Sequence, residues 1–372
     1  MELILKGNCN DAFAHLYLVG LASILEDADL SHQRVCLIRW KDREHAVLKS
    51  SDDLSWQQCA DIVHEHAQRW SKSYWLNATG EYWESPKEDD SKTSTKLSAR
   101  RATLSPRLGK PNTRQCWQKL ENDRHKAIDQ LETSLDYEYI GALGEPSYWS
   151  GDLTDKNYTP DYGASSWEMV ARNRGQEFIS GRLLPLAQAV ANRKVEKVLS
   201  GLRGDSVVDE AGKDNQLSRT PTGLRRPSKT DNAQAWCALF GVAAFPQFKS
   251  TTLKRGAKSA KANRGATTGF FRIKSSGQYA VLPLYEQFWT VQKYRSVVRS
   301  LWLEQAAICE VCASEETSGE TRVDSFTGRG SQWLKEQGVA QYVVFPQYKS
   351  NNVSAPERWL QKGVIFDVQG GD

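Results

Sequence analysis

Several features that would mark common classes of protein are missing from this 372-residue sequence. No stretch approaches 18 consecutive apolar residues, so we expect no membrane-spanning helix and no membrane partner. The first residues, Glu-Leu-Ile-Leu-Lys-Gly, have the pattern of a strand and lack the apolar core of a secretory signal. The seven cysteines are odd in number and scattered, which is typical of free thiols in a reducing compartment. We therefore expect a soluble protein of the cytoplasm.

Histidine is confined to the first third of the sequence, where it occurs six times and last at His125. The rest of the chain therefore has no imidazole for general base catalysis or metal binding. The cluster from Cys59 to His66 is the best metal candidate, but His64 and His66 point about 200° apart on a helix and cannot hold one ion together. Cys309 and Cys312 have C-x-x-C spacing without a second pair of ligands nearby. We predict no metal site at either place.

Catalytic motifs are also missing. The sequence contains no Walker motif, no G-x-S-x-G and no H-E-x-x-H, and the Gly-Arg-Gly at 328–330 lacks the rest of a phosphate-binding fingerprint. We predict no catalytic residue and no cofactor, which favours a non-enzymatic role. Two alternatives remain open at this stage: a metal-dependent nuclease that uses Asp and Glu, and a protein-interaction scaffold without direct nucleic-acid contact.

Hydrophobic periodicity predicts a mixed α+β fold, with an N-terminal α+β unit followed by a largely helical body that carries a small β-hairpin. The predicted unit is 1–83, with strands at Glu2–Leu5, Gln33–Trp40 and His45–Lys49 and helices at Phe13–Leu25 and Leu54–Trp70. Residues 84–114 are rich in Ser, Thr, Lys, Pro and Arg, and we expect a basic flexible linker or loop there.

The predicted body spans 115–372. Its expected helices are Gln115–Leu135, Ser166–Val198 with a break near Pro185, Asn232–Phe245, Gln287–Ile308 and Gln332–Gln337. Between the first two of these helices, Tyr137–Gly151 is rich in turn-forming and aromatic residues. Its expected strands are Gly269–Lys274, Gln278–Leu284, Val339–Phe345 and Gly363–Val368.

The net charge is only +4, so positive charge must be concentrated to matter, and it is concentrated between Lys249 and Lys274. This stretch has no acidic residue, and most of its other residues are Gly, Ala, Ser and Thr. A long cationic loop cannot bury its charges without partners, and phosphate is the commonest polyanionic partner. The predicted nucleic-acid contacts in it are Lys249, Lys254, Arg255, Lys258, Lys261, Asn263, Arg264, Arg272 and Lys274. A solvated surface loop is the simpler alternative.

Two smaller polar and basic spots are further candidates. One is Arg172, Asn173 and Arg174, followed by Gly175. The other is Arg225, Arg226 and Lys229 in the turn-rich segment before residue 232. Arginine and lysine bind phosphates regardless of sequence, whereas Arg and Asn side chains in a groove also read base edges.

Several patches together resemble the large subunits, of the Cas-eight type, of type I CRISPR effector complexes. Gly7 to Leu25 resembles their opening polar turn and helix, with a leucine-x-x-x-Gly-Leu motif from Leu16 to Leu21. Ala235 to Phe245, followed by Pro246, resembles an apolar helix that ends in Phe-Pro and contains Gly241. Leu282-Pro-Leu-Tyr285, the helical stretch 291–303 and the passage 333–344 also fit. The chain is most similar to the short large subunit of subtype I-G, formerly I-U.

The resemblance implies a non-catalytic subunit of a crRNA-guided surveillance complex. Such subunits bind target double-stranded DNA beside the protospacer, where they recognise the protospacer-adjacent motif (PAM) and help to open the duplex, while base pairing with the crRNA reads the rest. The implied partners are the crRNA, the target DNA, the backbone and foot subunits of the complex, and the helicase-nuclease that is recruited. In this sequence the basic stretch 249–274 would contact the DNA, with Arg225, Arg226 and Lys229 as a second contact.

Overall fold

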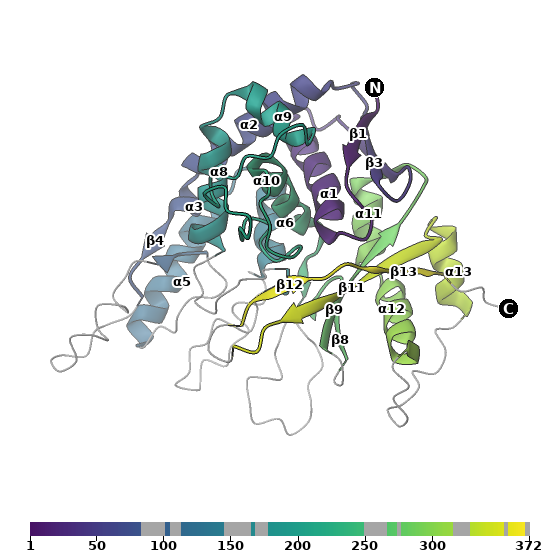
Figure 1. The fold of residues 1–372 in the computed structure, drawn as a ribbon. Coiled ribbons are helices and arrows are strands. Elements are labelled where there is room, and N and C mark those ends of the chain that lie inside the picture. The colour runs from purple at the N-terminus through teal and green to yellow at the C-terminus, as the bar shows by residue number, and fades with distance from the viewer. Residues whose placement is uncertain are drawn as a thin grey trace.

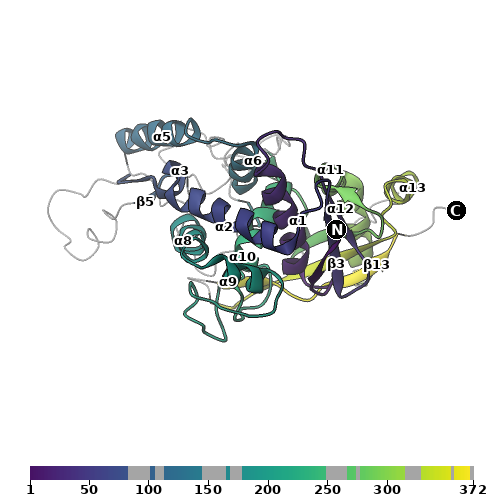
Figure 2. The same cartoon turned by 90° about the horizontal axis from the view of Figure 1, so that it is seen from above.

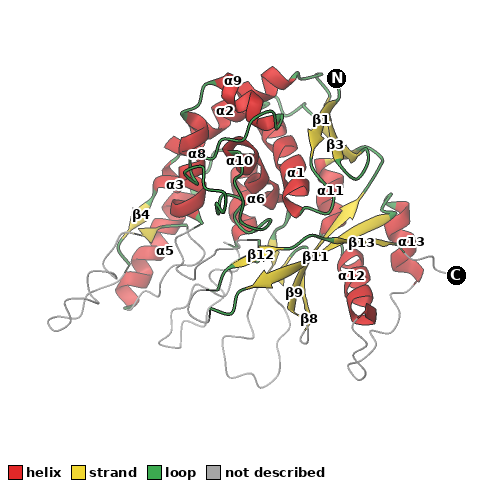
Figure 3. Cartoon of the chain, in the orientation of Figure 1, coloured by secondary structure: helices red, strands yellow, loops and turns green. Residues whose placement is uncertain are grey.

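The computed structural model describes residues 1–82, 101–104, 113–144, 165–167, 178–248, 266–273, 277–314, 328–352 and 356–368. Helices and small antiparallel sheets occur together (Figure 3), which confirms the mixed α+β class that the sequence predicts.

The first sheet joins the N-terminal strands to one late strand. Its members, in the order β1-β3-β2-β10, are β1 (Leu3–Lys6), β3 (His45–Ser50), β2 (Cys36–Trp40) and β10 (Trp289–Thr290). Every neighbouring pair is antiparallel. The buried residues of β1 and β2 alternate with more exposed ones, as the two-residue period of a half-buried strand requires. The three strands predicted within the first 50 residues are confirmed.

Helix α1 (Ala12–Asp27) occupies the centre of the fold. It begins at Asp11, whose carboxylate accepts a hydrogen bond from the backbone N–H of Phe13 at 3.0 Å. Every residue from 12 to 25 is buried, so this helix is covered on all sides, which confirms the helix predicted at 13–25.

Helices α2 (Trp56–Lys72), α6 (Ser134–Leu143), α10 (Asn232–Phe240) and the 3₁₀-helix η3 (Gly241–Ala244) pack against α1. The other described helices before residue 245 are α3 (Tyr74–Asn77), α5 (Arg114–Ile128), the π-helix η2 (Ile179–Leu183), α8 (Leu184–Ala191) and α9 (Val195–Leu202). Helix α1 packs against α10 and η3, and α2 packs against α8 and α9. Figure 2 shows α1, α2, α8 and α10 grouped together, with α5 at the edge of the molecule.

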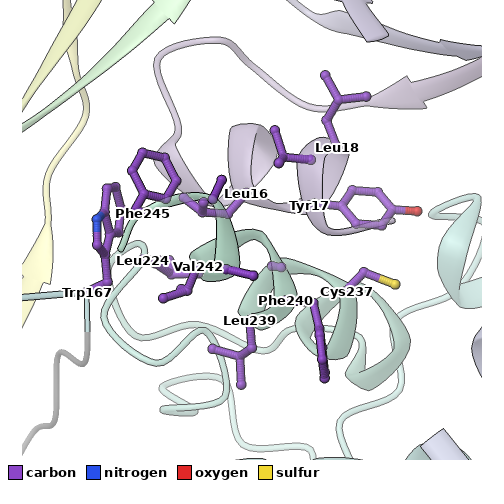
Figure 4. Close-up of a cluster of buried hydrophobic side chains, with 14 of the residues drawn as sticks. Leu16, Tyr17, Leu18, Trp167, Leu224, Cys237, Leu239, Phe240, Val242 and Phe245 are labelled. Carbon is purple, nitrogen blue, oxygen red and sulfur yellow. The ribbon is translucent and has the colours of Figure 1, made fainter. Parts of the chain in front are cut away.

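Two glycines allow α1 and α10 to approach each other closely. A Cβ atom at Gly20 would overlap the carbonyl oxygen of Cys237, and a Cβ atom at Gly241 would overlap the carbonyl oxygen of Leu16. Figure 4 shows Leu16 and Tyr17 of α1 lying over the helix that carries Cys237. Both glycines belong to motifs that the sequence singles out, and the structure places the two motifs against each other.

The second sheet follows in the last third of the chain. Its order is β12-β11-β9-β8, and β13 also pairs with β11, with β8 (Phe270–Ile273), β9 (Gly277–Leu284), β11 (Gln341–Lys349), β12 (Arg358–Leu360) and β13 (Val364–Asp367). The late helices are α11 (Val291–Val298), α12 (Leu301–Ser314) and α13 (Gly328–Glu336), and α12 packs on β8 and β9. Two short ladders pair β4 (Thr79–Gly80) with β5 (Arg101–Ala102) and β6 (Gln247–Phe248) with β7 (Ala266–Thr267).

Two predicted helices are wrong in extent, because capping residues inside them start new helices. The range 115–135 contains the end of α5 and the start of α6, where the Thr133 hydroxyl accepts from Asp136 N and the Asp136 carboxylate accepts from Thr133 N. Helix α6 also covers residues 137–143 of the range 137–151 that we expected to be rich in turns, and residues 145–151 lie outside the described ranges. The range 287–308 is divided into β10, α11 and α12, and Thr290 and Ser300 accept the hydrogen bonds that start the two helices.

The predicted N-terminal unit and the predicted body share one hydrophobic core. Strand β10, from residues 289–290, is a member of the N-terminal sheet, and α1 packs on α10. Figure 1 shows the first sheet, at β1 and β3, close to α11 from the late part of the chain. The boundaries at 84 and 115 stay a prediction, because residues 83–100 and 105–112 lie outside the described ranges.

We expect Gly20→Ala to destabilise the protein by about 3 kcal/mol or more, because the new methyl group meets backbone atoms that cannot move without separating two buried helices. Gly141→Ala in α6 is the matched control, since a Cβ there meets no atom within 4 Å. The control should be neutral or stabilising by up to about 1 kcal/mol, as helix propensity predicts. Urea unfolding measures both, and equal midpoints for the two variants would contradict the packing argument.

Two histidines are buried in the core in neutral form. The Nε2–H of His15 donates to the carbonyl oxygen of Cys9 at 2.7 Å, and its ring lies 4.7 Å from that of Trp40. Burial lowers the pKa of His15 to about 4. His66 accepts from Trp236 Nε1 at 3.1 Å, and burial likewise lowers its pKa well below the usual value.

These lowered pKa values predict that the free energy of unfolding decreases at acidic pH. The unfolded histidine titrates near pH 6.5, so the stability is fully present above that pH and is lost as the pH falls towards 4. His15 alone accounts for a loss on the order of 3 kcal/mol, from a pKa shift of about 2.5 units. Unfolding free energies between pH 7.5 and pH 4 should therefore decline less steeply in His15→Gln, and the exposed His125→Gln should decline as the parent does. An unchanged slope in His15→Gln would disprove this assignment.

Candidate nucleic-acid interface

The structure describes the two strands that flank residues 249–265, but it does not describe most of the predicted basic stretch. Strand β6 pairs with β7 through Gln247 opposite Thr267 and Phe248 opposite Ala266. The residues that flank 249–265 therefore lie side by side. Of the predicted contacts in this stretch only Arg272 is described, and it is exposed on β8 opposite Gln278. The others lie outside the described residues: Lys249, Lys254, Arg255, Lys258, Lys261, Asn263, Arg264 and Lys274.

Described residues that precede the second predicted spot are bonded to β7 and the residue after it. Arg172, Asn173 and Arg174 are not among the described residues, but Ser166 and Trp167 are. The backbone N–H of Ser166 donates to the hydroxyl of Thr267 at 2.9 Å, and the indole N–H of Trp167 donates to the carbonyl oxygen of Thr268 at 2.9 Å. Described residues that precede the second spot are thus hydrogen-bonded to residues that follow the gap 249–265.

The third predicted spot lies in a long segment, 203–231, that buried carboxylates hold in place. Asp209 is fully buried and accepts hydrogen bonds from four donors at 2.6–3.1 Å. These donors are Gly212 N, Thr220 Oγ1, Thr230 N and Asn232 Nδ2. Asp231 forms a second buried anchor, with Arg193 Nη1 at 3.0 Å. A loop without helix or strand is therefore fixed by charge-assisted hydrogen bonds.

A tight turn at Pro221–Leu224 projects from this segment towards the second sheet. Thr222 and Gly223 have φ values of 52° and 78°, and Leu224 N donates to Pro221 O at 3.0 Å. Two consecutive left-handed residues are typical of a type I′ turn. A left-handed conformation is strained for a β-branched residue such as Thr222. The turn is tied to β12, because the carbonyl oxygen of Gly223 accepts from Leu360 N at 2.8 Å.

Arginines from three parts of the chain meet around this turn. The small cleft beside it is lined by Arg182 from η2, Arg219 and Arg225 from the loop, and Arg358 from β12. Arg226 is the next residue in the loop and is exposed. We call these five residues the arginine cluster. The carboxylates that pair with it among the described residues are Glu357, with Arg219, and Asp11, with Arg225.

The three predicted residues of this spot have different surroundings. Arg225 is held by the protein itself: Nη1 lies 3.3 Å from Asp11, Nη2 donates to Thr230 at 2.8 Å, and the guanidinium lies 4.3 Å from the centre of the Phe13 ring. Lys229 pairs with Asp214 at 2.8 Å. Arg226 is the exposed member, so it has the easiest access to an outside ligand.

Two aromatic rings adjoin the arginine cluster. Tyr348 of β11 and Trp359 of β12 are paired across the two strands and stack with ring centroids 4.1 Å apart. Trp359 also lines the cleft beside the turn, and Tyr348 is 38% exposed. Sequence reasoning missed Arg182, Arg358 and both rings. Arg182 comes from η2, and the pairing of β12 with β11 and with Gly223 brings Arg358 and the two rings to the turn.

The arginine cluster and Arg272 lie at opposite edges of one sheet. Arg358 is in β12 and Arg272 is in β8, and the order β12-β11-β9-β8 separates them by three strand spacings, roughly 14 Å. Such a distance is within the reach of a single nucleic-acid molecule, whose phosphates repeat along its length.

Other features that the sequence analysis weighed are also placed by the structure. Across the part of the chain that is described, no three His, Cys, Asp or Glu side chains are arranged to hold a metal ion. None of the seven cysteines, all of them within the described ranges, forms a disulfide, and Cys309 is half-buried and Cys312 exposed on α12. None of the helices in the described ranges has the length and apolar character needed to cross a membrane.

No protein-family model matches the chain, and no curated protein has a sequence significantly similar to it.

We expect Asp209→Asn to destabilise the protein by about 2–3 kcal/mol, because an amide cannot accept from all four donors and leaves buried groups unsatisfied. Asp205→Asn is the matched control in the same loop, because its carboxylate pairs with the exposed Arg203 and Lys6 and the substitution should cost less than about 1 kcal/mol. Urea unfolding and limited proteolysis within 203–231 measure the effect. Similar losses in the two variants would show that Asp209 does not anchor the loop.

Proposed function

We propose that this protein binds nucleic acid as a non-catalytic large subunit of a crRNA-guided surveillance complex of the type I CRISPR kind. The family resemblance of the sequence supports the assignment, and so does the contact between Gly20 and Gly241, which gives a packing reason for two of its motifs. In this role the chain binds target DNA beside the protospacer, recognises the PAM, helps to open the duplex and helps to recruit the helicase-nuclease. It works in the cytoplasm with the crRNA and the backbone and foot subunits.

The arginine cluster is the observation that carries the nucleic-acid part of the proposal. Four arginines line the cleft beside one turn that buried carboxylates hold in place, and the exposed Arg226 follows Arg225 in the same loop. A guanidinium presents several N–H donors in a plane and binds phosphate oxygens in pairs. The adjoining rings of Tyr348 and Trp359 offer apolar surface beside this charge, as nucleic-acid-binding surfaces commonly do.

Neutralising part of the arginine cluster should weaken DNA binding in a salt-dependent way. We would express the protein with its native operon, purify the assembly and measure its affinity for a target duplex from 50 to 200 mM salt. Arg182→Gln, Arg226→Gln and Arg358→Gln together should lower the affinity about 10- to 100-fold. The slope of log affinity against log salt concentration should become shallower by the equivalent of up to about three phosphate contacts. The matched control is the exposed set on α5, Arg114→Gln, Lys119→Gln and Lys126→Gln, which should leave binding unchanged.

Further variants separate the proposal from its alternatives. Neutralising Lys254, Arg255, Lys258, Lys261 and Arg264 together tests the basic stretch in the same assay. Unchanged affinity in both sets of variants, with assembly intact, would favour an interaction scaffold. Cleavage of DNA by the purified chain in Mg²⁺ would favour a nuclease, and either result would overturn the proposal.

A further inference from the structure

A second, chemically distinct cleft lies where α11 meets α12, facing α13. Its volume is about 740 Å³, within the range of pockets that hold one small ligand. The lining residues are Gln292, Arg295, Ser296, Arg299, Ser300, Leu301, Trp302, Gln305 and Trp333. They include basic, amide, hydroxyl and indole groups, and no carboxylate is present among these described residues.

The cleft has an excess of positive charge. Arg295 is 5% exposed, and its two terminal nitrogens face the Glu138 carboxylate, but its Nε–H has no acceptor among the described residues. Arg299 lies one turn further along α11 and is exposed. Although Arg299 is exposed, partial desolvation and the positive charge of Arg295 lower the pKa of its guanidinium, and the Glu138 carboxylate offsets this only in part. The Arg295 Nε atom itself is closed off from solvent, so Arg299 is the guanidinium that an anion in the cleft can reach.

The start of α12 adds a further source of positive potential. Helix α12 begins at Leu301, and the Ser300 hydroxyl accepts from the backbone N–H of Trp302 at 3.0 Å. The remaining N–H groups of this first turn lie beside Arg299, and helix N-termini favour anions, phosphate above all.

Two indole rings line the same cleft. Trp302 is 36% exposed and Trp333, from α13, is half-buried. Exposed indoles are the side chains on which nucleobases stack, and the amides of Gln292 and Gln305 are donors and acceptors suited to base edges.

We propose that this cleft binds one nucleotide unit, with its phosphate at Arg299 and the start of α12, and its base against Trp302 and Trp333. The preference for a nucleotide over other aromatic anions rests on the proposed function, whereas the position of the cleft is independent of the arginine cluster. In Figure 1, β12 of the arginine cluster is well separated from α12 and α13. The same base and phosphate chemistry is offered by a free nucleotide and by one residue of a single strand.

The test uses the full chain labelled with 5-fluorotryptophan and followed by ¹⁹F NMR. Trp302→Phe and Trp333→Phe assign the two resonances, and the other tryptophans serve as internal controls. AMP and a three-nucleotide single strand are titrated separately, with adenosine as the ligand that lacks phosphate. We expect shifts confined to the Trp302 and Trp333 resonances, an affinity at least 10-fold weaker for adenosine, and a loss of at least 10-fold in Arg299→Gln. Arg114→Gln on α5 should bind as the parent does.

Each outcome decides the question. Saturable shifts with AMP identify a free nucleotide as a sufficient ligand, and shifts with the trinucleotide alone identify a strand. No shift with either ligand, or equal affinity for adenosine and AMP, overturns the proposal. The triple variant Arg182→Gln, Arg226→Gln and Arg358→Gln should keep the response of the cleft. If the cleft fails this test while the triple variant still weakens duplex binding, only the nucleotide site is lost and the proposed function stands.

Discussion

The close approach of α1 to α10 is the constraint on which the rest of the structure depends. Because Gly20 and Gly241 have no side chains, the two backbones meet directly, and residues 12–25 of α1 are buried on every face. The contact joins residues about 220 positions apart in the sequence. It brings the N-terminal sheet, the surrounding helices and the segment before β6 into one core, from which the polar loops project.

Buried polar groups connect the arginine cluster to that core. Arg225 is bonded to Asp11, the residue that starts α1, and Asp209 and Asp231 hold the rest of the 203–231 segment. Breaking the four hydrogen bonds that a buried carboxylate accepts is costly, so the loop keeps one conformation even though it contains no helix or strand. The strained residue Thr222 is held within this frame. The arrangement therefore fixes several arginines in place before any ligand binds, which reduces the entropy that binding must overcome.

The sequence predicts individual helices and strands well, but it does not predict which residues from distant segments come together. The periods of apolar residues identify α1, α2 and the first three strands, because each depends on neighbouring residues. The division of 115–135 and 287–308 was missed because single capping residues such as Thr133 compete with a continuous helical pattern. At the candidate site, Arg225 and Arg226 were predicted from their clustering in sequence. Arg182, Arg358 and Trp359 were not, because Arg182 comes from η2 and the other two from β12, far from the loop in sequence.

Ultraviolet cross-linking of the natively purified assembly, followed by mass spectrometry of this chain, tests the central claim most directly. The account predicts nucleotide adducts on peptides that cover 219–229 and 348–359, and on the basic stretch 249–274. Adducts should be absent from the α5 peptides at 114–128, which carry comparable exposed positive charge. An assembly that contains nucleic acid but gives no adduct on this chain, or adducts on α5 alone, would contradict the claim that the arginine cluster binds a phosphate backbone.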